Sequence, residues 1–249
     1  DSLGCNGHAL VETPNLDRLA SQGVMFDRAI VTNPICTPSR VSIYSGQYCL
    51  NHGYYGLSAV PGRKDQDHEV DMGNLPSLFA RLKREGYTTG VAGKLHTPVG
   101  WLEPHIDYLQ TNTDYHSYLE SIGGFYNPVS ERYDDSDMPR SRTGPASFGH
   151  DGAPSPRPYE ETHEGWTARR AIEFLDTHGD EPFFLQVGFK RPHSPYTPSR
   201  RFWDMYDDTR LTLPPNADYE MTHKPPHLRA KRKSLEEMGE RGGVERKTY

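Results

Sequence analysis

Apolar residues recur with helical spacing at three places along the chain. A first helix is predicted between Thr13, which suits an N-cap, and a stop at Gly23. A second is predicted from a cap at Asn74 to Gly86, and a third ends near Gly179. The residues expected on the buried faces of these helices are Leu16, Leu19 and Ala20; Leu75, Leu78, Phe79 and Leu82; and Ala168, Ala171, Ile172 and Leu175.

Three short apolar runs predict β-strands. Val24–Ile30 follows the first helix, Tyr87–Ala92 the second and Phe183–Val187 the third. The last run has apolar residues at both odd and even positions, as expected of a strand that is covered on both faces. Consecutive helix–strand units predict an α/β fold in which helices pack on a sheet.

Two polar stretches interrupt or follow this framework. Residues 103 to about 160 show no repeat and no periodicity, which predicts a loop-rich insertion. Within it, Asp134–Asp137 lacks the glycine and the distal glutamate of an EF-hand, so a solvated loop is favoured over a calcium loop. From Met221 onward the chain is charged and poor in large apolar residues. This composition predicts a polar C-terminal arm over about 221–249, either on the surface or separated from its packing partner.

Composition narrows the classes of function. The chain has 249 residues, enough for a substantial core, yet only 34% of them are hydrophobic. Its mean hydropathy is −0.82, which suits long ordered loops around a modest framework. The net charge of −6 without a basic block argues against a nucleic-acid surface, and the apolar run at 183–189 is too short to span a membrane. Three cysteines define no disulfide framework, and pairing of Cys5 with Cys49 stays open.

The segment Cys36-Thr37-Pro38-Ser39-Arg40 carries the clearest chemistry. A proline at the first helical position predicts a helix that begins at or just after Cys36 and runs through Val41, Ile43 and Tyr44. Unbonded N–H groups and the positive end of the helix dipole favour an anionic ligand beside Cys36. Arg40, about one turn further on, can fold back towards the same place.

A lysine and a histidine follow each of the two later predicted strands. Lys94 and His96 follow the second strand, and Lys190 and His193 follow the third. Ligands in α/β sheets bind outside the C-terminal ends of the strands, so these side chains are expected at one edge of the sheet. Fixed positive charges and a titratable group are what an anionic tetrahedral transition state requires.

Taken together, these motifs resemble the signature of the formylglycine-dependent (type I) sulfatases of the alkaline-phosphatase-like superfamily. That signature is Cys-x-Pro-Ser-Arg followed by a small-Gly-x segment, here Ser45-Gly46-Gln47, with Gly-Lys-x-His and Pro-His-x-Pro after later strands. Leu3–Gly7 and Thr13–Asp17 also resemble the N-terminal region of the family. The resemblance implies an alkaline-phosphatase/sulfatase-like mixed sheet with helices on both faces, and makes residues 1–249 part of one catalytic domain.

The resemblance also implies a modified nucleophile. A formylglycine-generating enzyme, as a transient partner, would oxidise Cys36 to formylglycine (3-oxoalanine). One hydroxyl of the hydrated aldehyde would attack the sulfur of a sulfate ester, and loss of the proton from the other would release sulfate. The family uses a divalent cation, usually Ca²⁺, and residue 36 would be its contact within this chain. The remaining metal ligands are expected before Asp1 and beyond Tyr249, which would make this chain an internal piece that is inactive alone.

Roles for other residues follow from the same resemblance. Arg40 would hold and polarise the diol, and Lys94 would bind a sulfate oxygen. His96 would take the diol proton, while His193 would bind the sulfate and help to protonate the leaving oxygen. Lys190 is a weaker match, either facing the substrate or lying on the rim of the site.

Other histidines are expected in surface positions or local packing, and among them His52 is expected nearest to the pocket. The aromatic residues Trp101, Tyr108, Tyr115, Tyr118, Phe125 and Tyr126 either stack on a sugar or pack the polar insertion.

The expected substrate is a small-molecule or carbohydrate sulfate ester, in a parent protein exported to the periplasm, cell surface or lysosome. A phosphonate or phosphodiester hydrolase of the same superfamily is the alternative enzyme. An inert truncated module is the alternative without catalysis.

Overall fold

The computed structural model describes residues 3–56, 74–98, 100–123, 154–193, 196–206, 210, 221–230 and 232–233. The chain divides into two compact units. The first unit comprises Asp1–Gly90, Leu95–Leu109 and His178–Phe184, and the second comprises Val91–Lys94, Gln110–Thr177 and Leu185–Tyr249.

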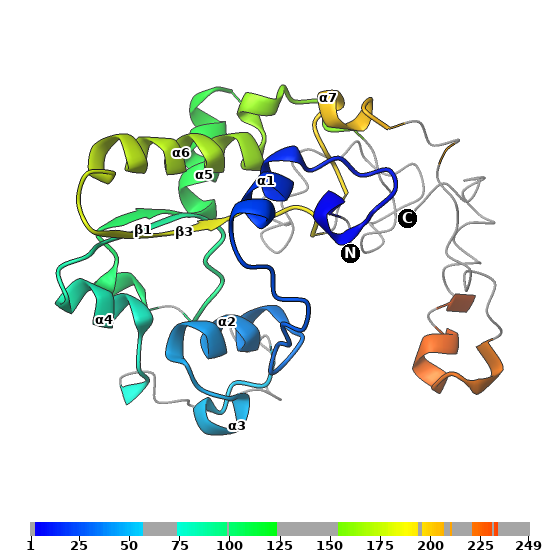
Figure 1. Cartoon of the computed structure of the whole chain (residues 1–249), viewed down its shortest axis with the longest axis horizontal. Coiled ribbons are helices and arrows are strands. Elements are labelled where there is room, and N and C mark those ends of the chain that lie inside the picture. Colours follow the sequence, from blue (N-terminus) through cyan, green and yellow to red (C-terminus); the bar gives the residue numbers. More distant parts are fainter. Residues whose placement is uncertain are drawn as a thin grey trace. The chain divides into compact units, whose positions relative to one another are not determined.

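A three-stranded sheet has the strand order β2-β1-β3. Its strands are β1 (Thr88–Gly93), β2 (Tyr108–Gln110) and β3 (Phe183–Gly188), of which β1 and β3 run side by side in Figure 1. The Thr88 N–H donates to the Pro182 carbonyl at 2.9 Å, and the Lys94 N–H donates to the Gly188 carbonyl at 2.7 Å. The two bonds have the same offset in residue number, so β1 and β3 are parallel. This arrangement confirms the predicted α/β class.

Helix α1 (Pro14–Gln22) lies between the predicted Thr13 and Gly23. Helix α2 (Cys36–Ser45) begins at the predicted cysteine and ends at Gly46, which has a φ of 69°. Because Ile35 is the N-cap, Pro38 is the third helical residue and not the first. The first four N–H groups of a helix lack intrahelical partners, so proline is tolerated there as well.

Helix α4 (Leu78–Arg84) begins later than the sequence predicts. The Ser77 hydroxyl accepts a hydrogen bond from the Ala80 N–H at 3.2 Å, so Ser77 and not Asn74 is the N-cap. Leu75 therefore precedes the helix, while Phe79 is fully buried as predicted. Asn and Ser are both favourable N-cap residues, and the hydrogen bond from the Ala80 N–H identifies Ser77 as the cap.

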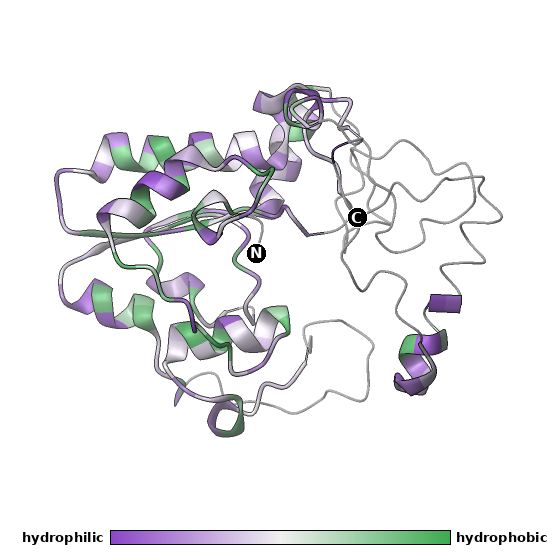
Figure 2. Ribbon diagram, turned by 45° about the vertical axis from the view of Figure 1, so that its right-hand side comes forward, coloured by the Kyte–Doolittle hydropathy of each residue, from purple (hydrophilic) through white to green (hydrophobic). Residues whose placement is uncertain are grey.

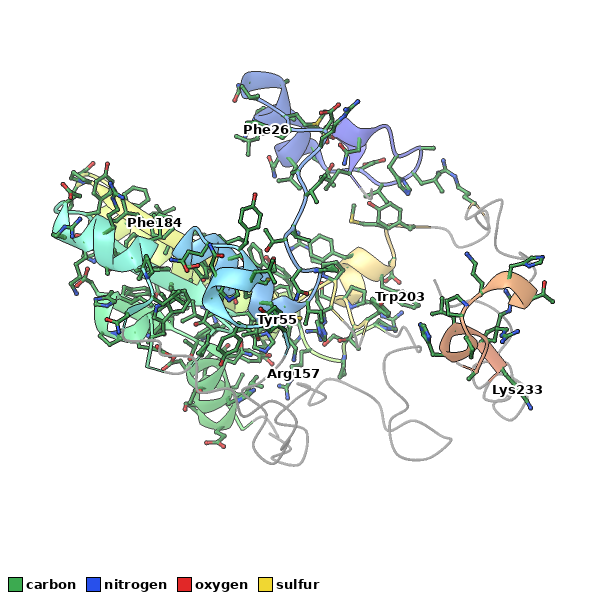
Figure 3. The ribbon with its side chains drawn as sticks, turned by 90° about the horizontal axis from the view of Figure 1, so that it is seen from below. Phe26, Tyr55, Arg157, Phe184, Trp203 and Lys233 are labelled. Carbon is green, nitrogen blue, oxygen red and sulfur yellow. The ribbon has the colours of Figure 1, made fainter. Side chains whose placement is uncertain are left out.

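The predicted strand at Val24–Ile30 is wrong, because this segment has no β-structure. Phe26, labelled in Figure 3, is 78% exposed, and the predicted buried face of α1 is also open, with Leu19 66% exposed. A strand forms only where its N–H and C=O groups find a partner. Among the described residues, no strand pairs with this segment.

The segment predicted as a loop-rich insertion contains regular structure over its described part. It includes η4 (Glu103–His105), β2 and α5 (Asn112–Ser121), whose N-terminus has a capping box of Thr111 and Asp114. Helix α5 buries only Tyr115 and Leu119, so its apolar periodicity is too weak to recognise. Asp134–Asp137, Phe125 and Tyr126 lie outside the described residues.

Three aromatic rings pack together in the first unit. Phe79 of α4 packs between Tyr44 of α2 and Phe184 of β3, with ring centroids 5.4 and 5.1 Å apart respectively. Phe184 is labelled in Figure 3. Such tilted and edge-on pairs add to the free energy of area burial, so this stack fixes α2 against α4.

The core of the second unit lies between α5 and α6 (His163–His178). Tyr115, Leu119 and Trp166 form its buried cluster. The buried residues of α6 are His163, Gly165, Trp166, Thr167, Ala171 and Phe174. The predicted stripe on this helix is therefore only partly right, because Ile172 is 56% exposed. Figure 2 shows hydrophobic and hydrophilic residues along α6, and its buried residues include the polar His163 and Thr167, which an apolar stripe does not select.

Short elements complete the described structure: η1 (Gly4–Asn6), α3 (Cys49–His52), η6 (Tyr159–Glu161), α7 (Arg200–Trp203) and η8 (Met221–His223). Residues 222–230 are exposed, in agreement with the polar C-terminal arm. None of the three cysteines forms a disulfide bond. Within the described ranges, no helix has both the length and the apolar character needed to cross a membrane.

Candidate active site

The first turn of α2 presents Cys36 as its first residue. The cysteine is half-buried, and the Thr37 and Pro38 that follow it are buried. The Thr37 hydroxyl is buried without a hydrogen-bond partner among the described residues. Unbonded N–H groups at a helix start attract anions, so the local geometry suits an oxyanion next to residue 36.

Arg40 connects α2 to the segment that follows β1. Its Nη1 donates a hydrogen bond to the Leu95 carbonyl at 3.3 Å, and both residues belong to the first unit. The Tyr44 hydroxyl also interacts with this guanidinium: burial raises the pKa of Tyr44, and the nearby Arg40 charge opposes that shift. Arg40 is therefore held between its own helix and the residue that precedes His96.

His96 is exposed and has a φ of 54°. Residues other than glycine rarely adopt this left-handed conformation, which costs of order 1 kcal/mol or more and is concentrated at functional sites. The chain turns sharply at this histidine directly after the buried Leu95. The local backbone thus presents the imidazole to solvent.

In the second unit, the ends of β1 and β3 approach unusually closely. Gly93 has a φ of 90°, and a Cβ atom there would collide with the Gly188 carbonyl oxygen and lie 2.8 Å from a Thr167 methyl carbon. A Cβ atom at Gly188 would meet the backbone of Lys94. Glycines at both positions let the strands bring Lys94 next to the end of β3.

The turn after β3 carries Lys190 and His193. Lys190 is 8% exposed, and its carbonyl accepts a hydrogen bond from the His193 N–H at 3.1 Å, which closes the turn. The His193 side chain is exposed. The structure therefore groups Lys94, Lys190 and His193 at the two strand ends of the second unit, while Cys36, Arg40 and His96 belong to the first unit. Assembly of all six into one site stays a prediction.

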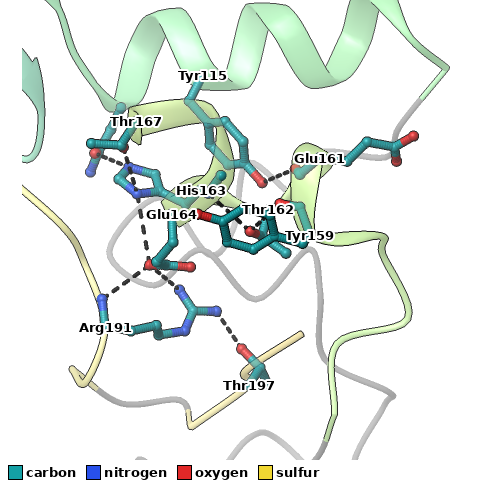
Figure 4. Close-up of polar contacts among 11 residues, drawn as sticks. Tyr115, Tyr159, Glu161, Thr162, His163, Glu164, Thr167, Arg191 and Thr197 are labelled. Atoms are coloured by element: carbon teal, nitrogen blue, oxygen red, sulfur yellow. Dashed lines mark hydrogen bonds and ion pairs between the residues drawn. The ribbon is translucent and has the colours of Figure 1, made fainter. Parts of the chain in front are cut away.

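The sequence did not reveal the polar network that supports this turn (Figure 4). Glu164 Oε1 accepts a hydrogen bond from the Arg191 N–H at 3.1 Å and lies 3.7 Å from Arg191 Nη1. Arg191 Nη2 donates to the Thr197 hydroxyl. Glu164 and Arg191 are 27 residues apart, so no local motif could have indicated the pairing.

His52 lies in α3 and is 2% exposed. Its Nδ1 accepts a hydrogen bond from the Tyr54 N–H at 3.0 Å, and its Nε2 lies 2.9 Å from the Ser42 hydroxyl. A neutral ring that accepts at Nδ1 carries its proton on Nε2, so His52 donates to Ser42. Burial lowers the pKa of His52. These contacts join α3 to the second half of α2, almost two turns beyond Cys36.

Two of the aromatic residues considered for sugar stacking are packing residues. Trp101 is 4% exposed, and its Nε1–H donates to the Leu75 carbonyl at 3.4 Å. Tyr115 is fully buried, and its hydroxyl donates to the Glu161 carbonyl at 2.9 Å. Tyr108 and Tyr118 are half-buried.

Metal-ligating side chains do not gather in the part of the chain that the structure describes. No group of three or more His, Cys, Asp or Glu residues there could hold an ion. The described donors therefore do not by themselves fit a divalent cation.

A parallel β1–β3 pair whose strands are followed by polar residues, and a helix that begins with Cys-x-Pro-Ser-Arg, agree with an alkaline-phosphatase-like α/β fold. Residues 1–238 match the sulfatase family, and the chain belongs to that family. This match confirms the family that the motifs indicated.

Individual relatives agree with this assignment. The chain is 30% identical to human iduronate 2-sulfatase over 224 residues, which is 87% of this chain and 37% of the relative. It is 28% identical to an arylsulfatase of Clostridium perfringens, covering 88% and 46% of the two chains. The structure of a phosphonate monoester hydrolase of Agrobacterium radiobacter is similar with a TM-score of 0.62 and 25% identity, covering 86% and 42%. The chain thus spans less than half the length of each.

Proposed function

We propose that the intact protein hydrolyses sulfate esters with residue 36 as the nucleophile. The observation that carries this proposal is the hydrogen bond from Arg40 to the Leu95 carbonyl, at 3.3 Å. It links the Cys-x-Pro-Ser-Arg helix start to the Gly-Lys-x-His segment, although the two are more than 50 residues apart in the sequence. Membership of the sulfatase family supports the same conclusion.

The first unit provides the nucleophile and a base. Cys36, once oxidised to formylglycine, would supply a hydrated aldehyde whose hydroxyl attacks sulfur. Arg40 orients this group from one helical turn away, where its position is fixed by the Leu95 carbonyl and Tyr44. His96, exposed at the end of the same segment, accepts the proton that is lost when sulfate is released.

The second unit provides positive charge and an acid. Lys94 and Lys190 follow adjacent parallel strands and bind sulfate oxygens, where they stabilise the negative charge of the transition state. His193 binds the sulfate and protonates the leaving oxygen. We also propose Ca²⁺ as the cation of the intact enzyme, with ligands supplied largely by other parts of the protein. The intact protein is further proposed to be exported from the cytoplasm.

Sulfated carbohydrates are the proposed substrate class. Two relatives are named for such compounds, iduronate 2-sulfatase and N-acetylgalactosamine-6-sulfatase, the latter 26% identical over 227 residues. With Trp101 and Tyr115 buried in packing roles, the sugar would have to be recognised by other side chains.

The deciding test compares kcat/KM of the intact protein for p-nitrophenyl sulfate and for a phenyl phosphonate ester. We expect the sulfate ester to be preferred. The alternative substrate is a phosphonate ester, because a phosphonate monoester hydrolase is among the structural neighbours. A preference for the phosphonate would therefore reassign the enzyme within the superfamily.

A second test addresses the nucleophile directly. After co-expression with a formylglycine-generating enzyme, peptide mass spectrometry should find the aldehyde at residue 36 and not at Cys5 or Cys49. Cys36→Ala is the control and should abolish turnover. An unmodified thiol under these conditions would favour an inert module.

A further inference from the structure

One carboxylate at the start of α6 holds the turn that carries Lys190 and His193 (Figure 4). Glu164 Oε1 accepts a hydrogen bond from the Arg191 backbone N–H at 3.1 Å, while Arg191 Nη1 lies 3.7 Å from the same oxygen. Glu164 therefore contacts both the backbone and the side chain of the residue between Lys190 and Pro192. All of these residues belong to the second unit.

Arg191 extends this connection further along the chain. Its Nη2 donates a hydrogen bond to the hydroxyl of Thr197, which is 1% exposed. His193 lies between Arg191 and Thr197 in the sequence. The Glu164–Arg191–Thr197 contacts thus connect the start of α6 to one residue before the histidine and one after it.

Burial makes this connection strong. The side chains of Glu164 and Arg191 are 21% and 12% exposed, so solvent screens their attraction only in part. Hydrogen bonds with an ionised acceptor are roughly twice as strong as neutral ones. The start of α6, which carries Glu164, is held in place by the neighbouring His163. His163 is buried, and its Nε2 lies 2.8 Å from Asn112 Oδ1.

We propose that Glu164 is a positioning residue that sets the placement of His193 and Lys190 through Arg191. The inference rests on the proposed function, in which these two residues bind sulfate and protonate the leaving oxygen. Glu164 does not contact substrate in this scheme. Displacement of a catalytic group by about 1 Å can cost on the order of 100-fold in rate, so loss of the carboxylate should reduce catalysis without removing any reacting group.

The test measures kcat and KM of the intact enzyme for p-nitrophenyl sulfate, per mole of formylglycine. Glu164→Ala should lower kcat/KM by about 100-fold, mainly through kcat. Glu164→Gln keeps an oxygen acceptor for the Arg191 N–H and should recover about 10-fold of that loss. If Glu164→Ala does not fold, Glu164→Asp replaces it, because the shorter side chain keeps the charge and loses the reach.

Glu173→Ala is the matched control. Glu173 lies on the same helix and pairs with Arg170, away from the turn. Glu173→Ala should have the same kcat and the same melting temperature as the unsubstituted enzyme. Equal kcat values for the Glu164→Ala and Glu173→Ala enzymes would overturn the proposal.

Amide hydrogen exchange separates this inference from the proposed function. Exchange at Arg191 and His193 should accelerate in Glu164→Ala and not in Glu173→Ala, whether or not the protein turns over any ester. Absence of sulfate turnover by the unsubstituted enzyme would sink the proposed function alone. Unchanged exchange would sink the positioning role.

Discussion

At the residue scale, Arg40 joins two motifs through a contact that depends on its shape. One guanidinium nitrogen reaches the Leu95 carbonyl at 3.3 Å, while the group also interacts with the Tyr44 hydroxyl. A planar fork with several N–H donors can serve both partners at once. An ammonium group has the same charge but offers its donors from a single atom.

Arg40→Lys should therefore lower kcat/KM of the intact enzyme by about 10- to 100-fold, because a hydrogen bond from a charged group contributes about 1.5–3 kcal/mol. The measurement is steady-state hydrolysis of p-nitrophenyl sulfate. Arg84→Lys, on an exposed part of α4, is the control and should behave like the unsubstituted enzyme. Full activity of Arg40→Lys would show that only the charge matters.

His52 makes a second prediction at this scale, for stability and not for catalysis. Burial lowers its pKa, and protonation would also place a hydrogen on Nδ1, opposite the Tyr54 N–H that it now accepts. The unfolded chain therefore binds the proton more readily than the folded one. Its contribution to stability is fully present above about pH 6.5 and is lost as the pH falls towards the lower, folded-state pKa.

Urea unfolding between pH 7.5 and 5 should show this loss with a slope of at most about 1.4 kcal/mol per pH unit. His52→Asn cannot titrate, yet its side-chain oxygen can still accept from Tyr54, so its slope should be smaller. The same slope in both proteins would assign the pH dependence to other groups.

At the scale of elements, the ends of β1 and β3 depend on Gly93. Its positive φ and its contact with Gly188 and Thr167 leave no room for a side chain. Gly93→Ala should lower the free energy of unfolding by about 3 kcal/mol, since left-handed strain and overpacking add. Gly86→Ala separates the two effects, because Gly86 has a φ of 85° but no atom within 4 Å of the place that a Cβ would occupy.

Urea denaturation provides the comparison. Gly86→Ala should lose only about 1 kcal/mol, the cost of its left-handed backbone. Equal losses for the two variants would mean that the strand ends can move apart to accept a methyl group.

The elements also show how far local signals extend. Both ends of α1 and the start of α2 agree with the sequence, because caps and stops involve residues within one turn of the helix end. The start of α4 does not, since Asn74 and Ser77 are both good caps and only the bond to the Ala80 N–H selects Ser77. The 24–30 run has the composition of a strand but lacks a partner among the described strands.

At the scale of the whole molecule, the first unit exposes several large apolar side chains close together in the sequence. They are Leu16, Leu19, Val24, Met25, Phe26, Ile30, Val31 and Ile35, each at least 41% exposed. Single exposed apolar residues are ordinary, but eight of them within residues 16–35 indicate a surface that another part of a protein covers. The matched relatives are more than twice as long as the region they share with this chain.

Residues 1–249 expressed alone should therefore bind the apolar dye ANS more strongly, mole for mole, than the intact protein. Burial of apolar surface is favourable, so the intact protein should cover this surface, whereas the isolated chain leaves it open to the dye. Replacing Phe26 and Ile30 by serine should reduce dye binding by the isolated chain. Equal dye binding by the isolated chain and the intact protein would show that this surface stays open.

The sequence by itself determined the family and the α/β class, and it predicts the residues of the active site. The Cys36–Arg40 motif, Lys94, His96 and His193 are recognisable because each is a local pattern fixed by its distance from a helix start or a strand end. Tertiary structure decided which faces are buried, which cap is used and that Glu164 pairs with Arg191. These outcomes depend on contacts between residues that are far apart in the sequence, and such contacts cannot be read from the local spacing of residue types.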